Sequence, residues 1–210
     1  MPACRAVCFD LDGTLLDSLV SHYRVYRRVF AELGLALEEG AYADRYSPNW
    51  YIFYERMGLA RDRWDEADQL WLRHYENEAP HARPGADDVL AAIQASGRRL
   101  GLVTSGDRSR VERDIRRAGW EETFDVVVCG GDVEERKPLP GPLLHALLAL
   151  RIEPAASLYV GDTVEDIAMG KAAGTRTAGV LGGFSGREAL EAASPDHLVT
   201  SLRELVTLVG

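Results

Sequence analysis

The feature that most constrains the fold is a regular alternation of helical and strand-like segments from residue 85 to residue 208. The expected helices are 85–96, 108–118, 140–150, 164–173 and 201–208, and the expected strands are 99–104, 124–129, 157–161, 175–180 and 197–200. An earlier apolar run, 4–10, is too short for a typical helix and adds a first strand. Strands separated by helices of this length require right-handed crossovers. The sequence therefore predicts an α/β fold with a doubly wound, Rossmann-like parallel sheet.

Between the first strand and this alternation lies a stretch, 17–83, that carries helical patterns alone. Three helices are expected in this stretch. The first starts at a cap formed by Asp17 and Ser18 and stops at Gly34, and the second runs from near Pro48 to Gly58. The third is indicated by the apolar spacing from Trp64 to Tyr75. Prolines 80 and 84 break the pattern and mark a return linker. We expect a core domain made of residues 1–16 and 84–210, with an all-helical domain of residues 17–83 inserted into it.

Composition and charge exclude several partners. The formal net charge is -9, whereas nucleic-acid polymers and anionic membranes select basic faces. No apolar run approaches the ~18 residues of a membrane span, and no signal peptide is visible, so we expect a cytoplasmic protein. The sequence does not indicate the oligomeric state, for which we expect a monomer or homodimer. Three cysteines and five histidines stand at no metal-ligand spacing, and we expect the cysteines to be buried, reduced thiols.

Polar side chains gather where the expected strands end. These strand ends are Asp10 to Thr14, Thr104 to Asp107, Cys129 to Asp132 and Gly161 to Thr163. In open parallel sheets, ligands bind beyond the carboxyl ends of the strands. We therefore expect these four segments to meet at one edge of the sheet and to form the binding site.

Asp10 and Asp12 flank a single leucine and project to the same side if extended geometry persists. Taken alone, this pair is equally well explained as the end of a strand and the cap of a turn. Asp162 and Asp166 add two acids one helical turn apart, and like charges 4 Å apart cost about 4 kcal/mol at an effective dielectric of ~20. A divalent cation would turn this repulsion into a binding site, and all-oxygen ligands favour Mg²⁺.

Lysine is almost absent from the chain, because Lys137 and Lys171 are the only lysines among 24 basic residues. A lysine retained in a chain that otherwise uses arginine indicates a need for a compact point charge, and Lys137 follows the third polar strand end. The ordinary interpretation of a single loop lysine is a solvated side chain, and this holds for Lys171 as an exposed helix residue.

Four segments together resemble the motifs of the haloacid dehalogenase superfamily. They are "FDLDGTLLDS", "LGLVTSGD", "ERKPLPGPLL" and "YVGDTVEDIAMGKAAG", in that order between residues 8 and 174. The helical insertion occupies the position of that superfamily's α-helical cap, and the tail "GTRTAGVLGGFSGREALEAASPDHLVTSL" is similar to the phosphoglycolate phosphatase and pyrophosphatase-like subfamily. The resemblance implies an Mg²⁺-dependent phosphatase acting on a small phosphorylated metabolite, either a phosphoglycolate-like monoester or pyrophosphate.

The resemblance also implies residue roles. Asp10 would attack phosphorus and form an aspartyl phosphate, while Asp12 would protonate the leaving oxygen and then activate water. The metal would be held by Asp10, the main-chain carbonyl of Asp12 and Asp162, with Asp166 behind them. Phosphate-binding residues would be Thr104, Ser105 and Lys137.

Three other activities are weighed against a phosphatase. Dehalogenases of the superfamily need no second aspartate, so Asp12 counts against them, and phosphonatases need a lysine that residues 1–136 lack. A sugar phosphomutase of the β-phosphoglucomutase type shares the motifs, and His22 stands at a spacing from Asp10 similar to a functional histidine of those mutases. An inactive, regulatory member of the superfamily would lack turnover with every phosphorylated compound.

Substrate choice is expected to depend on the helical insertion. The segment "YADRYSPNWYIFYERMGL" places Arg45, Tyr46, Asn49 and Trp50 around a break between two helices, where they can close over the site. Arg45 is the candidate for pairing with a substrate carboxylate or second phosphate. The alternative is that Tyr46 and Trp50 belong to the core of a small helical bundle and that Arg45 is solvated.

Overall fold

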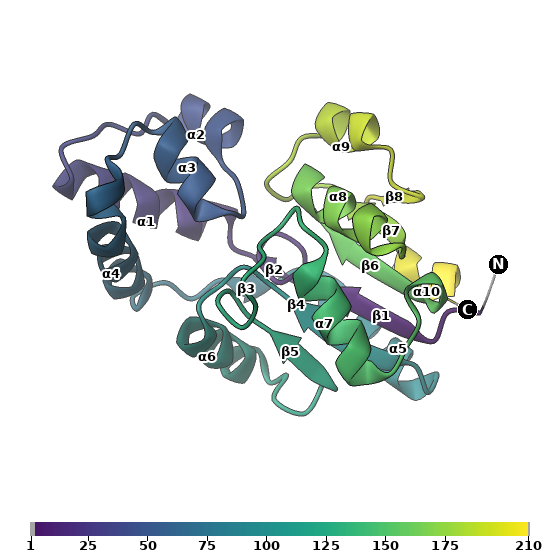
Figure 1. Ribbon diagram of the computed structural model, residues 1–210. Helices are drawn as coiled ribbons and strands as arrows, with labels where there is room; N and C mark the ends of the chain where they lie inside the picture. The colour runs from purple at the N-terminus through teal and green to yellow at the C-terminus, as the bar shows by residue number, and fades with distance from the viewer. Residues whose placement is uncertain (1–2, 210) are drawn as a thin grey trace.

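Six parallel strands form the central sheet of the computed structural model, which describes residues 3–209 (Figure 1). The strands are β1 (Ala6–Phe9), β4 (Arg99–Val103), β5 (Val126–Val128), β6 (Ser157–Gly161), β7 (Arg176–Val180) and β8 (His197–Val199). Their order in the sheet is β5-β4-β1-β6-β7-β8, so the chain runs outward from β1 on one side and then returns to build the other. The predicted α/β fold with a doubly wound parallel sheet is confirmed.

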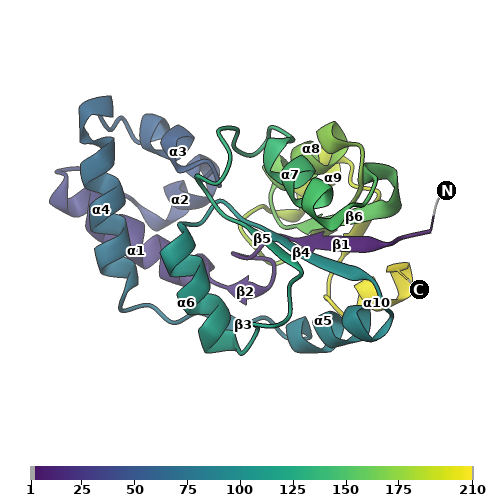
Figure 2. The same ribbon diagram turned by 60° about the horizontal axis from the view of Figure 1, so that its bottom comes forward.

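Helices cover both faces of this sheet (Figures 1 and 2). One face packs against α5 (Ala86–Ala95), α6 (Arg108–Ala118) and α10 (Glu204–Val209), and the other against α7 (Gly141–Leu150) and α8 (Val164–Ala173), with α9 (Arg187–Ala193) beside α8. Side chains of a strand alternate between faces, so Val7 and Phe9 enter the first layer whereas Ala6 and Cys8 enter the second. Burial on both faces explains why β1 is apolar throughout.

Four helices between β1 and β4 form a separate lobe, which we call the helical lobe (residues 19–75; purple to blue in Figure 1). They are α1 (Leu19–Glu32), α2 (Glu39–Arg45), α3 (Trp50–Arg56) and α4 (Trp64–Tyr75), the last preceded by a 3₁₀ turn at Arg61–Arg63. The lobe has its own aromatic core, in which Tyr26, Phe30 and Phe53 meet edge to face or stacked. Phe184, from the loop after β7, also packs into that core.

A small antiparallel ribbon joins the lobe to the sheet domain. It pairs β2 (Leu16–Asp17) with β3 (His81–Ala82), so the chain enters and leaves the lobe side by side. The expectation that 17–83 is helical throughout is therefore wrong at both ends. Strands of two residues show no periodicity that a sequence pattern can reveal.

The expected elements agree with the structure to within about three residues at each end, apart from two short helices. Helices 108–118 and 164–173 and strand 157–161 have the expected bounds. The sequence pattern predicts neither α2 nor α9, two helices of seven residues that each bury a single side chain and so show no apolar period. Ser18 stands at the N-cap of α1 as expected, but its hydroxyl makes no capping hydrogen bond.

Two further expectations concern the cysteines and the membrane. Cys8 and Cys129 are buried free thiols, whereas Cys4 is partly exposed, because it lies two residues before β1. Within residues 3–209, none of the helices is both long enough and apolar enough to cross a bilayer.

Candidate active site

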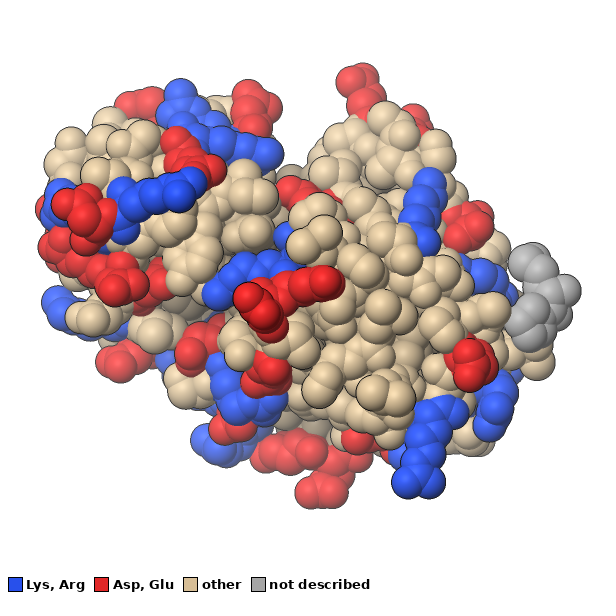
Figure 3. Space-filling view, in the orientation of Figure 1, with Lys and Arg blue, Asp and Glu red and all other residues tan. Residues whose placement is uncertain are grey.

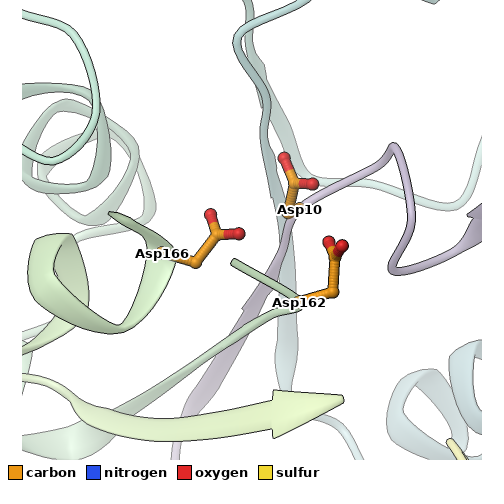
Figure 4. A group of neighbouring side chains, drawn as sticks. All are labelled: Asp10, Asp162 and Asp166. Atoms are coloured by element: carbon orange, nitrogen blue, oxygen red, sulfur yellow. The ribbon is translucent and has the colours of Figure 1, made fainter. Parts of the chain in front are cut away.

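Three buried aspartates meet at the carboxyl ends of β1 and β6 (Figure 4). Asp10 follows β1, Asp162 follows β6, and Asp166 lies in the first turn of α8. One carboxylate oxygen from each lies within 4.8 Å of the others. Because β1 and β6 are neighbours where the strand order reverses, this is the topological switch point at which doubly wound sheets bind ligands.

Lys137 is the cation of this cluster. Its ammonium group donates to Asp10 Oδ1 at 2.5 Å and to Asp166 Oδ1 at 2.8 Å, and the side chain is only 2% exposed. Asp166 is further fixed by the hydroxyls of Thr163 and Tyr159 and forms a capping box with Thr163 at the start of α8. The lysine that stands out in the sequence is therefore a buried point charge between two strand ends.

Backbone geometry fixes Asp162. Its carboxylate accepts from the Thr14 hydroxyl at 2.8 Å and from the Phe184 amide at 2.7 Å. Gly13 adopts a φ of 77°, and a Cβ at that position would collide with the Asp162 carboxylate. Only glycine satisfies both constraints, which explains its place directly after Asp12.

The cluster holds three carboxylates against one ammonium group, and its electrostatics reflect that imbalance. Burial raises the pKa of Asp162 to about 7, and repulsion from Asp166 adds to the shift. Burial also raises the pKa of Asp10 well above its usual range; the attraction of Lys137 opposes this, while Asp166 and Asp162 reinforce it. An all-oxygen set with excess negative charge fits a hard divalent cation.

Asp12 lies outside this cluster and has partners of its own. Arg110 donates to both of its carboxylate oxygens, at 3.0 and 2.6 Å, and His22 Nε2 lies 3.1 Å from Oδ1. Burial would raise the pKa of Asp12, but the charges and hydrogen bonds of Arg110 and His22 outweigh it and hold the pKa well below its usual range. Asp10 and Asp12 are thus each paired with a cationic side chain of their own, Lys137 and Arg110.

Two adjoining cavities lie beside these carboxylates. The larger, of about 170 Å³, lies between the helical lobe and the strand ends; the smaller is lined by Thr104, Ser105 and Lys137. Both share Ser105, Gly130 and Arg136 as lining residues, so they meet. The larger one is below the 300–1,000 Å³ typical of sites for drug-sized ligands, which suits a small metabolite.

Comparisons with known proteins agree with this architecture. A family model described as haloacid dehalogenase-like hydrolase matches residues 7–180. The chain belongs to that family. A pyrophosphatase PpaX of Bacillus pumilus is 39% identical over 98% of this chain and 96% of its own length, and a phosphoglycolate phosphatase of Cupriavidus necator is 32% identical over 98% and 93%. The crystal structure of a putative haloacid dehalogenase-like hydrolase from Bacteroides fragilis superimposes with a TM-score of 0.90 at 24% identity, covering 96% of this chain and 99% of that one.

Arg110 is the residue of this haloacid dehalogenase-like hydrolase that sequence reasoning missed. It is 4% exposed, contacts Asp114 at 3.4 Å, and lies 5.2 Å from the ring of Tyr75 in the helical lobe. A signal was present, because Arg110 and Asp114 form an i,i+4 pair on the same side of α6 as the apolar Val111 and Ile115. A charged pair on a buried face indicates a partner elsewhere in the fold.

The lobe residues predicted to act on substrate divide into two groups. Tyr46, Trp50 and His22 line the larger cavity, and Tyr46 stacks on Phe184 at 4.1 Å between ring centres. Among the described residues, Arg45 and Asn49 are not part of that lining, and Arg45 is exposed with an N–H near Met57 Sδ. In this family member the cavity cations are instead Arg110 and Arg136, both from the sheet domain.

Proposed function

We propose that this protein is an Mg²⁺-dependent phosphatase that hydrolyses a small phosphorylated metabolite through an aspartyl-phosphate intermediate. The observation that carries the proposal is Lys137 bridging Asp10 and Asp166 at the switch point of the sheet, with Asp162 beside them. The names of the pyrophosphatase and phosphoglycolate phosphatase relatives support a phosphoglycolate-like monoester or pyrophosphate as substrate. We expect the enzyme to work in the cytoplasm as a monomer or homodimer.

The proposed metal ligands are Asp10, the main-chain carbonyl of Asp12 and Asp162, with Asp166 orienting them from behind. Their oxygen donors and the surplus of negative charge fit Mg²⁺ better than zinc, since no histidine or cysteine joins the cluster within residues 3–209. When bound, Mg²⁺ would neutralise charge on the phosphoryl oxygens and on the attacking carboxylate.

In the proposed reaction, a carboxylate oxygen of Asp10 attacks phosphorus as the bond from phosphorus to the leaving oxygen breaks. Asp12, which is ionised and paired with Arg110 and His22 in the resting structure, would take up a proton as those contacts break and give it to the leaving oxygen, and the alcohol, or phosphate in the case of pyrophosphate, departs. Water then attacks the aspartyl phosphate, its proton passes to Asp12, and inorganic phosphate leaves with Asp10 regenerated. Lys137 is placed to offset charge at Asp10 throughout.

The phosphoryl group itself would lie next to Asp10 on the side of the smaller cavity, which at about 10 Å³ has room for about one water and would widen when substrate enters. Thr104 and Ser105, at the end of β4, would donate to its oxygens, and Lys137 would supply positive charge. The larger cavity, which meets the smaller one at Ser105, would hold the leaving alcohol.

Residues 17–83 would act as a cap over this site and residues 1–16 and 84–210 as the catalytic core. Contacts that hold the helical lobe against the core include Ser47 donating to Glu165 at 3.0 Å, the hydroxyl of Tyr75 donating to Asp114 at 3.1 Å, and the guanidinium of Arg136 4.3 Å from the ring of Trp50. A notch remains open between the lobe and the helices α8 and α9 on the face seen in Figure 3. Movement of the lobe would admit substrate and then exclude water.

The test is a phosphate-release screen of the purified protein with and without Mg²⁺. The panel contains phosphoglycolate, pyrophosphate, nucleotides, sugar phosphates and p-nitrophenyl phosphate. We expect Mg²⁺-dependent release from at least one of them. A complete lack of turnover would favour a regulatory protein on a phosphatase scaffold.

A sugar phosphomutase is the second candidate, and the observation that favours it is the contact of His22 Nε2 with Asp12 Oδ1. A histidine in this position could orient Asp12 for proton transfer with a sugar hydroxyl in place of water. An assay of β-glucose 1-phosphate conversion separates the two activities. Formation of glucose 6-phosphate at a rate above phosphate release would favour the mutase.

A further inference from the structure

Four residues that line the larger cavity carry a buried N–H group without a partner among the described residues, and these groups bear on the chemistry of its occupant. Buried donors without a hydrogen-bond partner among the described residues are Trp50 Nε1, Trp71 Nε1, Arg110 Nε and Arg136 Nη1. Buried polar groups are nearly always satisfied, so orphaned donors around a cavity indicate a ligand that brings acceptors. Asp68 also lines the cavity, but its carboxylate already accepts from Tyr54 at 2.9 Å.

Of the two arginines in this lining, Arg110 is the one next to the reacting groups. Its Nη1 and Nη2 hold the two oxygens of Asp12, the residue proposed to protonate the leaving oxygen. A group one or two bonds from that leaving oxygen must therefore lie beside Arg110. Arg136, by contrast, stacks over Trp50 and Tyr51 in the lobe.

The pairing seen here competes with the role proposed for Asp12. A bidentate guanidinium engages both carboxylate oxygens, and His22 adds a third donor to Oδ1. To protonate the leaving oxygen, Asp12 must break at least one of these hydrogen bonds. Arg110 would then be a buried cation whose remaining anionic partner is Asp114, at the longer distance of 3.4 Å.

We propose that Arg110 binds a second anionic group on the leaving part of the substrate, a carboxylate or a phosphate, and that this exchange releases Asp12 for the leaving oxygen. The proposal rests on the proposed phosphatase function and narrows its substrate class. A substrate anion replaces the charge that Asp12 withdraws, so the buried guanidinium stays paired. A substrate whose leaving group is neutral leaves Arg110 bound to Asp12 and is turned over more slowly.

The test compares phosphoglycolate with 2-hydroxyethyl phosphate, which has the same ester linkage but a hydroxymethyl group in place of the carboxylate. The measured quantity is the ratio of their kcat/KM values in the wild-type protein and in Arg110→Lys and Arg110→Gln. Pyrophosphate is assayed in parallel, so that a phosphate as the second anion is distinguished from a carboxylate. Arg113→Lys is the matched control, because Arg113 lies 5.1 Å from the same Tyr75 ring and contacts Asp114 but does not line the cavity.

We expect the wild-type protein to prefer phosphoglycolate or pyrophosphate over 2-hydroxyethyl phosphate. Because a hydrogen bond to a charged group contributes about 1.5–3 kcal/mol, that preference should fall about 10- to 100-fold in Arg110→Gln. Arg110→Lys keeps the buried positive charge and should keep the fold, but it loses the planar guanidinium that can donate two hydrogen bonds to one anion. The preference of this variant for the anionic substrates should therefore fall about 10-fold. The preference of Arg113→Lys should stay within about twofold of wild type.

An equal loss on all three substrates in Arg110→Lys would overturn the proposal and make Arg110 a positioning residue for Asp12 alone. A wild-type enzyme that turns over 2-hydroxyethyl phosphate as well as the two anionic substrates would also overturn it, while leaving the phosphatase function standing. Absence of any phosphate release would instead overturn the phosphatase function itself.

A binding measurement separates recognition from catalysis. In an Asp10→Asn background, which removes the nucleophile, calorimetric titration gives the Kd of phosphoglycolate directly. Adding Arg110→Lys should raise that Kd about 10-fold and change the Kd of 2-hydroxyethyl phosphate by less than about threefold. Equal changes in both Kd values would contradict direct binding of the second anion by Arg110.

Discussion

The strand-end cluster and the lobe side of the larger cavity form two halves of one site with opposite designs. In the cluster, Asp10, Asp162 and Asp166 have partners fixed by the backbone or by Lys137. On the lobe side, aromatic rings line the cavity and the indole N–H groups of Trp50 and Trp71 have no partner among the described residues.

This difference separates chemistry from recognition. Polar atoms that are already satisfied stay in place when a ligand arrives, which suits reacting groups that need a fixed geometry. The lobe is joined to the core by a ribbon of two short strands and carries N–H donors without a partner. Such a surface is suited to binding a ligand that supplies the missing acceptors. Changes to the cluster should therefore have larger effects on activity than changes to the lobe.

The largest effect should come from Asp10→Asn. Loss of the attacking carboxylate is expected to lower kcat by more than about 10³-fold. The fold should persist, because asparagine still accepts from Lys137 and removes one of three mutually repelling carboxylates. Phosphate release gives the rate and a thermal melt gives the stability. Activity within about tenfold of wild type would refute Asp10 as the nucleophile.

Removal of the metal should be the next largest effect. We expect EDTA to lower turnover strongly, though by less than Asp10→Asn does, and Mg²⁺ to restore it. We expect Asp162→Asn to weaken the apparent Mg²⁺ affinity by about 100-fold or more. Glu165→Gln is the matched control, because Glu165 is an acid on α8 next to Asp166 but accepts a hydrogen bond from Ser47 of the lobe and is not a proposed metal ligand. Equal Mg²⁺ dependence of both variants would contradict the assigned ligands. Mg²⁺ titrations of activity provide the measurement.

Stability of the metal-free protein should fall as the pH rises from about 4 to about 7. The pKa of Asp162 is raised from 3.8 to about 7 by burial first and by Asp166 second, so the folded state binds a proton that the unfolded state has released. Because the unfolded chain binds fewer protons between these two pKa values, the free energy of unfolding decreases there by about 1.4 kcal/mol for each step of one in pH. Thermal melts in EDTA test this.

Two variations sharpen the pH experiment. Excess Mg²⁺ should remove most of the loss at pH 7, because the cation stabilises the ionised carboxylates. Asp162→Asn should reduce the same slope without metal and leave the part that Asp10 contributes. A metal-free melting temperature that rises from pH 5 to pH 7 would show that the cluster is not under this strain.

Much of the strand-end cluster was predictable from sequence, whereas on the lobe side the sequence indicated the helices and three of the cavity residues but not their partners. Asp10 and Asp162 follow apolar runs, so the geometry of parallel sheets places them together without any knowledge of side-chain contacts. The bond between Arg110 and Asp12 joins residues 98 positions apart, and a local pattern cannot assign such a pair. Arg45 and Trp50 are close in sequence, yet only Trp50 lines the larger cavity among these two.

The smallest predicted effect tests that last distinction. Trp50→Leu keeps an apolar side chain but removes the ring beneath Arg136 and one orphaned donor of the cavity. Cation–π contacts of this kind contribute about 0.5–1 kcal/mol, so KM should rise about two- to fivefold with little change in kcat, and the order of preferred substrates should change. Arg45→Ala is the companion variant: a changed substrate ranking would support the role predicted for Arg45 from sequence, whereas an unchanged one would discard it. If Trp50→Leu lowers kcat and leaves KM unaltered, the lobe contributes to the chemistry, and the separation between the two halves of the site does not hold.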